Sequence, residues 1–127
     1  MEGMSTVEKD DEREYRITME IIVDTYGPEE QALGWYYYLA EKIQFPFEAK
    51  CIRERSISHL QLDEQVKVLR MADEDDCRVE MFVIIEWAGR SFGVPLAQLI
   101  GLNIDRQTEE AIADWHYWLG RGYLLCG

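Results

Sequence analysis

The chain has 127 residues, which is enough for one domain with a sizeable hydrophobic core. Hydrophobic residues make up 47% of it, and this excludes intrinsic disorder for the chain as a whole. The formal net charge of −12 argues against binding to nucleic acid or to anionic membranes, because both need clustered cations on the protein. It favours a cation or a basic protein as the partner.

Residues 1–14 are rich in acids and carry no apolar stripe, so we expect an acidic, flexible lead-in before a single domain at residues 15–127. The lead-in lacks the basic-then-apolar order of a signal peptide. No apolar run reaches the roughly 18 residues that a membrane-spanning helix requires. Cys51, Cys77 and Cys126 form neither a CxxC pair nor a disulfide framework, and we therefore expect a reducing, cytoplasmic location.

Apolar residues at three- and four-residue steps predict a helix from Tyr15 to Tyr26, with Tyr15, Met19, Ile22 and Tyr26 on its buried side. Gly27-Pro28 predicts the end of this helix and the start of a second one, because proline suits a first helical turn. The second helix is expected to run to Ile43, with an apolar side formed by Leu33, Tyr36, Tyr37, Ala40 and Ile43. Its aromatic cluster, Trp35 to Tyr38, is expected in the core.

Short strands follow. Residues 49–52 and 65–71 are strand-like, and the irregular apolar parity of the second segment suggests a β-bulge. The clearest strand is Val79 to Trp87, because its odd positions are all apolar. Ala88-Gly89-Arg90 predicts a hairpin turn to a strand through Phe92, Val94 and Leu96. Pro95 predicts that this strand lies at a sheet edge or ends there.

A C-terminal helix is predicted from a cap at Thr108, with Ile112, Trp115, Trp118 and Leu119 on its apolar side and an end at Gly120 or Gly122. The expected fold class is α+β. It consists of N-terminal helices, a small, strongly curved antiparallel sheet of three to five strands (SH3-like or barrel-like), and the C-terminal helix.

Sequence patterns for catalysis are weak. Cys77 and His59 form a conceivable nucleophile pair, but a lone cysteine and a lone histidine lack the context that an activated nucleophile needs. His116 lies within a helical aromatic run, where a structural histidine is the commoner case. The chain has no glycine-rich phosphate loop and no ligand spacing typical of zinc. We therefore expect a protein that is not an enzyme.

The strongest candidate site is an acidic run between two predicted strands. Calcium takes six to eight oxygen ligands from carboxylates, carbonyls and water, and a turn in which acidic side chains converge supplies them. The run does not match an EF-hand, because arginine stands at the position that requires glycine. A solvated turn, or an acidic protein–protein interaction module without a metal, is the alternative reading. The expected metal ligands are Asp73, Glu74, Asp75, Asp76 and Glu80, with Asp63 and Glu64 as secondary candidates.

The sequence also resembles a known family, the small bacterial calcium-binding proteins of the CcbP type, which are best known from cyanobacteria. The similarity runs in order from about Ile21 to Tyr123. It rests on the segment Ile21–Leu39 (IIVDTYGPEEQALGWYYYL), on Phe45-Pro46-Phe47, on Glu80-Met81-Phe82-Val83, on Val94-Pro95-Leu96 and on Asp114-Trp115-His116-Tyr117-Trp118.

The resemblance implies a cytoplasmic, non-EF-hand calcium binder that acts as a calcium buffer or sensor through surface carboxylates. The Tyr and Trp runs that carry it are core-like and do not identify ligands. The choice of Asp73 to Asp76 and Glu80 therefore rests on their chemistry alone.

Overall fold

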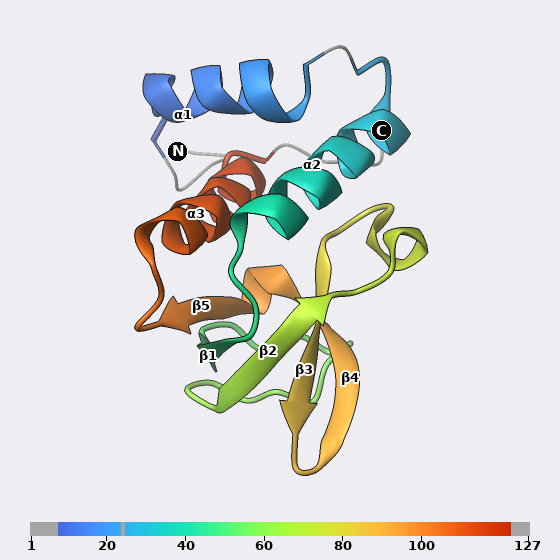
Figure 1. The fold of residues 1–127 in the computed structure, drawn as a ribbon, viewed down its shortest axis with the longest axis vertical. Coiled ribbons are helices and arrows are strands. Elements are labelled where there is room, and N and C mark those ends of the chain that lie inside the picture. Colours follow the sequence, from blue (N-terminus) through green and yellow to red (C-terminus); the bar gives the residue numbers. More distant parts are fainter. Residues whose placement is uncertain (1–7, 24, 123–127) are drawn as a thin grey trace.

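The computed structural model describes residues 8–23 and 25–122, and it confirms the α+β class (Figure 1). The helices gather on one side of a five-stranded sheet. None of the helices in these two ranges is long and apolar enough to cross a bilayer. The elements are α1 (Asp11–Arg16), which continues as a π-helix (Ile17–Ile21), α2 (Pro28–Lys42), β1 (Phe47–Cys51), β2 (Gln65–Met71), a 3-10 helix (Glu74–Cys77), β3 (Phe82–Trp87), β4 (Arg90–Pro95), a 3-10 turn (Leu96–Gln98), β5 (Leu99–Leu102) and α3 (Arg106–Gly120).

All strand pairs are antiparallel, in the order β4-β3-β2-β1-β5. The register of β2 against β3 shifts between Val68 and Arg70, which confirms the predicted bulge. Ala88 and Gly89, both with positive φ, form the tight turn of the predicted hairpin. Pro95 is the last residue of the edge strand β4. Because β4 and β5 lie at opposite edges, the described sheet is open, and strong curvature stays a prediction.

The strand predicted from Val79 begins only at Phe82. Met81, Val83 and Ile85 are fully buried, as their alternation predicts, but Val79 is 58% exposed. The chain leaves β2 through the 3-10 helix and further bends, so the residues before Met81 do not join the sheet.

The predicted N-terminal helix exists, but its limits and its buried face are wrong. Asp10 caps it by accepting a hydrogen bond from the backbone N–H of Arg13 at 3.0 Å, so the helix begins inside the segment that we expected to be a flexible lead-in. Ile17 and Ile21, four residues apart, supply the core contacts. Tyr15 is 70% exposed, because the true apolar stripe is offset from it by two residues.

Polar contacts also attach this helix to α3. Arg13 Nη1 and Arg16 Nη2 each donate to Asp114 Oδ1 at 2.7 Å, and Tyr38 donates its hydroxyl to Asp114 Oδ2 at 2.7 Å. The Tyr117 hydroxyl donates to Glu14 at 2.7 Å. Residues 11–14 are therefore part of the folded domain, and residues 1–7 of the expected lead-in lie outside the described range.

Helices α2 and α3 pack through aromatic side chains. Trp35 and Trp115 are both fully buried, with ring centroids 5.0 Å apart. The predicted apolar face of α2 is only partly correct. Ile43, Trp35 and Tyr38 are buried as predicted, but Leu33 and Tyr37 are 42% and 55% exposed. Ala32 and Leu39 face the core in their place. In α3 the cap is Asp105 rather than Thr108, which is buried and accepts a hydrogen bond from the Gln44 N–H.

Candidate metal centre

The acidic run lies at one end of β2, where the chain forms the 3-10 helix beside α2. The backbone N–H of Asp76 donates to Asp73 O at 2.9 Å and closes the helical turn. Cys77, the last residue of this turn, is buried, and its thiol accepts a hydrogen bond from the Phe82 N–H at 3.3 Å. This contact connects the turn to the start of β3. Four consecutive acidic residues therefore lie on a short turn whose last residue, Cys77, is held in the core.

The side chains of this turn point in different directions. Asp73 and Asp75 have side chains that are 82% and 87% exposed, and their nearest cations are Arg70 at 3.7 Å and Arg78 at 3.2 Å. In a 3-10 helix successive side chains project about 120° apart. Within residues 8–23 and 25–122 no three acidic, histidine or cysteine side chains form a ready-made metal site. The expected convergence is therefore absent from this conformation, and the role of these residues as calcium ligands stays a prediction.

Glu74 differs from its neighbours because it contacts α2. It accepts a hydrogen bond from the Tyr37 hydroxyl. This hydrogen bond raises the pKa of Tyr37, because it favours the protonated phenol that donates to Glu74. On the same helix, Tyr36 donates its hydroxyl to Ala72 O at 2.8 Å. Two tyrosines of α2 therefore fix the position of the acidic turn.

A cleft of about 190 Å³ opens between α2 and the acidic turn. Three carboxylates line it, and one of them, Glu29, comes from the first turn of α2. The sequence analysis missed Glu29, because only the packing of α2 against the turn brings it near Glu74 and Asp75. The remaining lining residues are Ala32, Leu33, Tyr36, Cys77 and Arg78.

The structure places Glu80 apart from this cleft. Its carboxylate pairs with Arg55 at 2.5 Å, and its side chain is only 16% exposed. Glu80 does not join the hairpin, because β3 starts only at Phe82. A mostly buried carboxylate with its own cation is a weaker calcium candidate than the exposed turn.

Asp63 and Glu64 lie at the other end of β2, about 20 Å from the acidic turn along the strand. Asp63 has a φ of 68° in a turn, and its 84% exposed side chain lies 3.9 Å from Lys50 Nζ. Glu64 accepts a hydrogen bond from the Gln61 N–H at 2.7 Å. They cannot share an ion with Asp73 to Asp76, so any ion there would occupy a separate site.

His59 and Cys77 do not form the nucleophilic pair that the sequence made conceivable. His59 is exposed in the loop between β1 and β2, whereas Cys77 is buried beneath the acidic turn. Burial raises the pKa of the Cys77 thiol, which is opposite to the shift of an activated cysteine. His116 lies with Nε2 2.8 Å from Leu99 O, as expected for a structural histidine.

Comparison with known proteins identifies the family. Residues 15–119 match the family model for CcbP-type calcium binding. The structure is similar to the crystal structure of Anabaena CcbP, with 42% identity, a TM-score of 0.84 and coverage of 94% of this chain and 98% of that chain. It is also similar to a calcium-binding protein in its calcium-binding form, with 41% identity, a TM-score of 0.83 and the same coverage of both chains. No curated protein matches significantly. This chain belongs to the CcbP-type calcium-binding family.

Proposed function

We propose that this protein binds calcium reversibly in the cleft between α2 and the acidic turn, with Glu29, Glu74 and Asp75 as the central ligands. Asp73 and Asp76 lie on the same turn and add negative charge and further oxygen donors. The observation that carries the proposal is that carboxylates of two separate elements line one cleft in a member of a calcium-binding family.

The chemistry of the cleft suits a hard cation. Calcium accepts irregular sets of carboxylates, backbone carbonyls and water, so exposed side chains that rotate inward can complete a coordination shell. Close carboxylates repel one another, and a divalent ion removes that repulsion. Arg70 and Arg78 compensate Asp73 and Asp75 only through exposed ion pairs, which contribute little and are readily displaced.

A role as a cytoplasmic buffer or sensor is consistent with this arrangement. The ligands are exposed rather than caged, which favours rapid and reversible exchange of the ion. Cys51 and Cys77 are free, buried thiols, as is usual for proteins of a reducing compartment. The chemistry required is binding alone.

Isothermal titration calorimetry tests the site. The wild-type chain is titrated with calcium in about 0.15 M salt, beside a cleft variant (Glu74→Gln with Asp75→Asn) and a matched control (Asp63→Asn with Glu64→Gln). Both variants lose the same formal charge. We expect saturable heat from the wild-type chain and the control, and loss of the strongest binding event in the cleft variant.

Two results would contradict the proposal. Equal weakening in both variants would mean that calcium responds to the total charge of the protein and not to the cleft. Weak heat that never saturates, and that salt abolishes, would favour an acidic interaction module. A magnesium titration supplies a further check, because a flexible carboxylate site should prefer calcium over the smaller ion, which needs strict octahedral geometry.

A further inference from the structure

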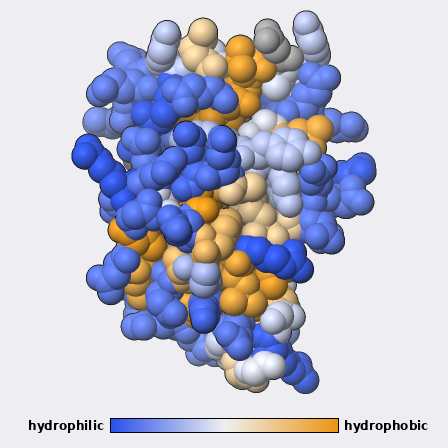
Figure 2. Space-filling view, viewed as in Figure 1, coloured by the Kyte–Doolittle hydropathy of each residue, from blue (hydrophilic) through white to orange (hydrophobic). Residues whose placement is uncertain are grey.

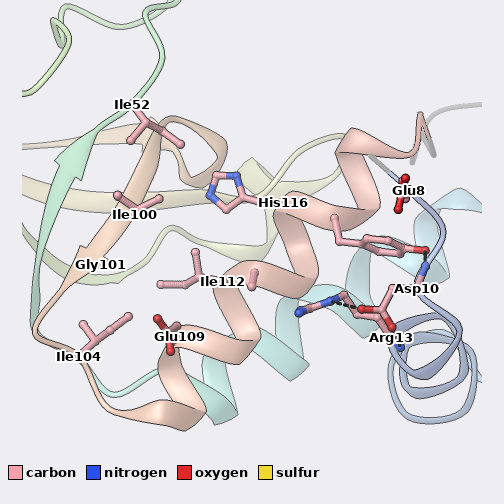
Figure 3. Close-up of a pocket in the computed structure, with 12 residues that line it drawn as sticks. Glu8, Asp10, Arg13, Ile52, Ile100, Gly101, Ile104, Glu109, Ile112 and His116 are labelled. Carbon is pink, nitrogen blue, oxygen red and sulfur yellow. Dashed lines mark hydrogen bonds and ion pairs between the residues drawn. The ribbon is translucent and has the colours of Figure 1, made fainter. Parts of the chain in front are cut away.

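A second and larger cavity lies away from the acidic turn. It is a groove of about 680 Å³ between the edge strand β5, helix α3 and the segment that leads into α1 (Figure 3). Its volume falls within the range of about 300–1,000 Å³ that is typical of binding pockets. None of its lining residues also lines the acidic cleft.

The floor of the groove is apolar. Four isoleucines from the sheet edge, the following loop and α3 line it: Ile52, Ile100, Ile104 and Ile112. Ile52 and Ile100 are 37% and 36% exposed, so part of this apolar surface faces water. The Ile104 side chain packs directly over Gly101, because a Cβ at position 101 would lie 2.3 Å from Ile104 Cδ1. The absence of a side chain at Gly101 therefore lets Ile104 form part of the floor. Burial of such a surface against apolar side chains of a partner is favourable.

The rim of the groove is negatively charged. Glu8, Asp10 and Glu109 contribute carboxylates, and Arg13 is the one basic lining residue in the described ranges. Arg13 already contacts Asp114 at 2.7 Å and Asp10 at 3.6 Å, so it does not offset the other acids. The hydrogen bond from the Arg13 N–H lowers the pKa of Asp10 and keeps it ionised.

His116 does not change the sign of this charge. It lines the groove from α3, and burial lowers its pKa, so the imidazole is neutral at pH 7. An apolar floor inside an acidic rim is complementary to apolar side chains flanked by cations.

We propose that this groove binds an amphipathic segment of a partner protein, whose leucine-like side chains fill the isoleucine floor and whose lysine or arginine residues contact the rim. The mode corresponds to an amphipathic helix that lays its apolar face in a groove. This surface is separate from the calcium cleft, so the inference does not depend on the proposed calcium function.

Fluorescence anisotropy tests the groove with a labelled leucine–lysine peptide of sequence LKKLLKLLKKLLKL, titrated with the full chain in about 0.15 M salt. The floor variant is Ile52→Ser with Ile100→Ser. Its control, Ile57→Ser with Leu62→Ser, alters two exposed apolar residues outside the groove (58% and 55% exposed). Neither pair changes the charge. We expect about tenfold weaker binding in the floor variant and less than about twofold change in the control.

A second pair of variants tests the rim and does not alter the floor. Glu109→Gln removes a rim carboxylate, and Glu41→Gln removes an exposed carboxylate of α2 that does not line the groove. We expect Glu109→Gln to weaken binding about threefold more than Glu41→Gln does. Amide chemical shifts of the wild-type chain provide a check that needs no variant, since the peptide should perturb residues 100–104 and 112–116 first.

Several outcomes would overturn the proposal. Unaltered affinity in the floor variant, with equal losses for Glu109→Gln and Glu41→Gln, would mean that the acidic protein attracts any polycation. Equal binding of the same peptide with glutamate in place of lysine would remove the role of the rim. Dimers that the floor variant abolishes, without peptide binding, would assign the groove to a second copy of the chain.

Discussion

Asp114 and Asp75 show two opposite uses of a carboxylate in one acidic protein. Asp114 is fully buried and accepts hydrogen bonds from Arg13, Arg16 and Tyr38. Asp75 has a side chain that is 87% exposed, with one contact at 3.2 Å to Arg78. On the face shown in Figure 2, most residues of the helical layer are hydrophilic. A carboxylate satisfied by protein donors stabilises the fold, whereas one that faces water remains available to an external cation.

The largest expected effect comes from the buried cluster. Asp114→Asn removes the charge that two arginines share, and it should lower the free energy of unfolding by about 3 kcal/mol, because unpaired partly buried cations remain. Arg13→Gln should cost only about 1 kcal/mol, since its side chain is 27% exposed and Arg16 keeps its bidentate contact. Urea unfolding measures both. Equal, small losses would mean that the cluster is not a structural unit.

Calcium should act on the exposed carboxylates of the acidic turn. At a free concentration about a hundredfold above the dissociation constant, it should raise the free energy of unfolding by about 2.7 kcal/mol, because the folded state alone binds it. The gain should disappear in Asp73→Asn with Asp75→Asn. Thermal unfolding with and without calcium checks this, and an unchanged midpoint for the wild-type chain at saturating calcium would remove the basis for the calcium site.

Without calcium the same double substitution should have a small effect. Each change should alter the free energy of unfolding by less than about 0.5 kcal/mol, and relief of charge repulsion should leave the apo protein no less stable. Chemical unfolding in the presence of a chelator measures this. A decrease in the free energy of unfolding as large as that of Asp114→Asn would show that the acidic turn, like Asp114, stabilises the fold.

The buried histidine gives a pH-dependent effect. Burial lowers the pKa of His116 below its ordinary value of 6.5 in the folded state. Between that lowered pKa and 6.5 the unfolded chain binds more protons, so the stability should fall as the pH falls through this window. His116→Gln should reduce the slope. Unfolding midpoints measured from pH 7 to pH 5 test it, and an identical slope in the variant would assign the dependence to other groups.

The hairpin of β3 and β4 was predictable because its signals are local, whereas β5 (Leu99–Leu102) was missed. The alternation of Met81, Val83 and Ile85 and the Ala88-Gly89 turn each require only neighbouring residues. The N-terminal helix carries two apolar sets at helical spacing, and only the packing of residues 17–21 against α2 selects Ile17 and Ile21 over Tyr15. Periodicity alone cannot make that choice.

The candidate site was predictable only in part, for the same reason. A run of four acids is visible in the sequence, but Glu29 joins it only through the packing of α2 on the turn. The pairing of Glu80 with Arg55 likewise depends on tertiary structure, and it removes Glu80 from the acidic turn. Sequence spacing therefore identified the acidic turn but not the element that faces it.

The most direct test of the central claim is a calcium titration followed by amide chemical shifts of the full chain. The cleft site predicts that residues 29–33 and 73–78 shift together, along one saturation curve, while residues 63–64 and 80 respond weakly. Small shifts spread over all acidic segments, or a saturating response confined to residues 63–64 or 80, would contradict it.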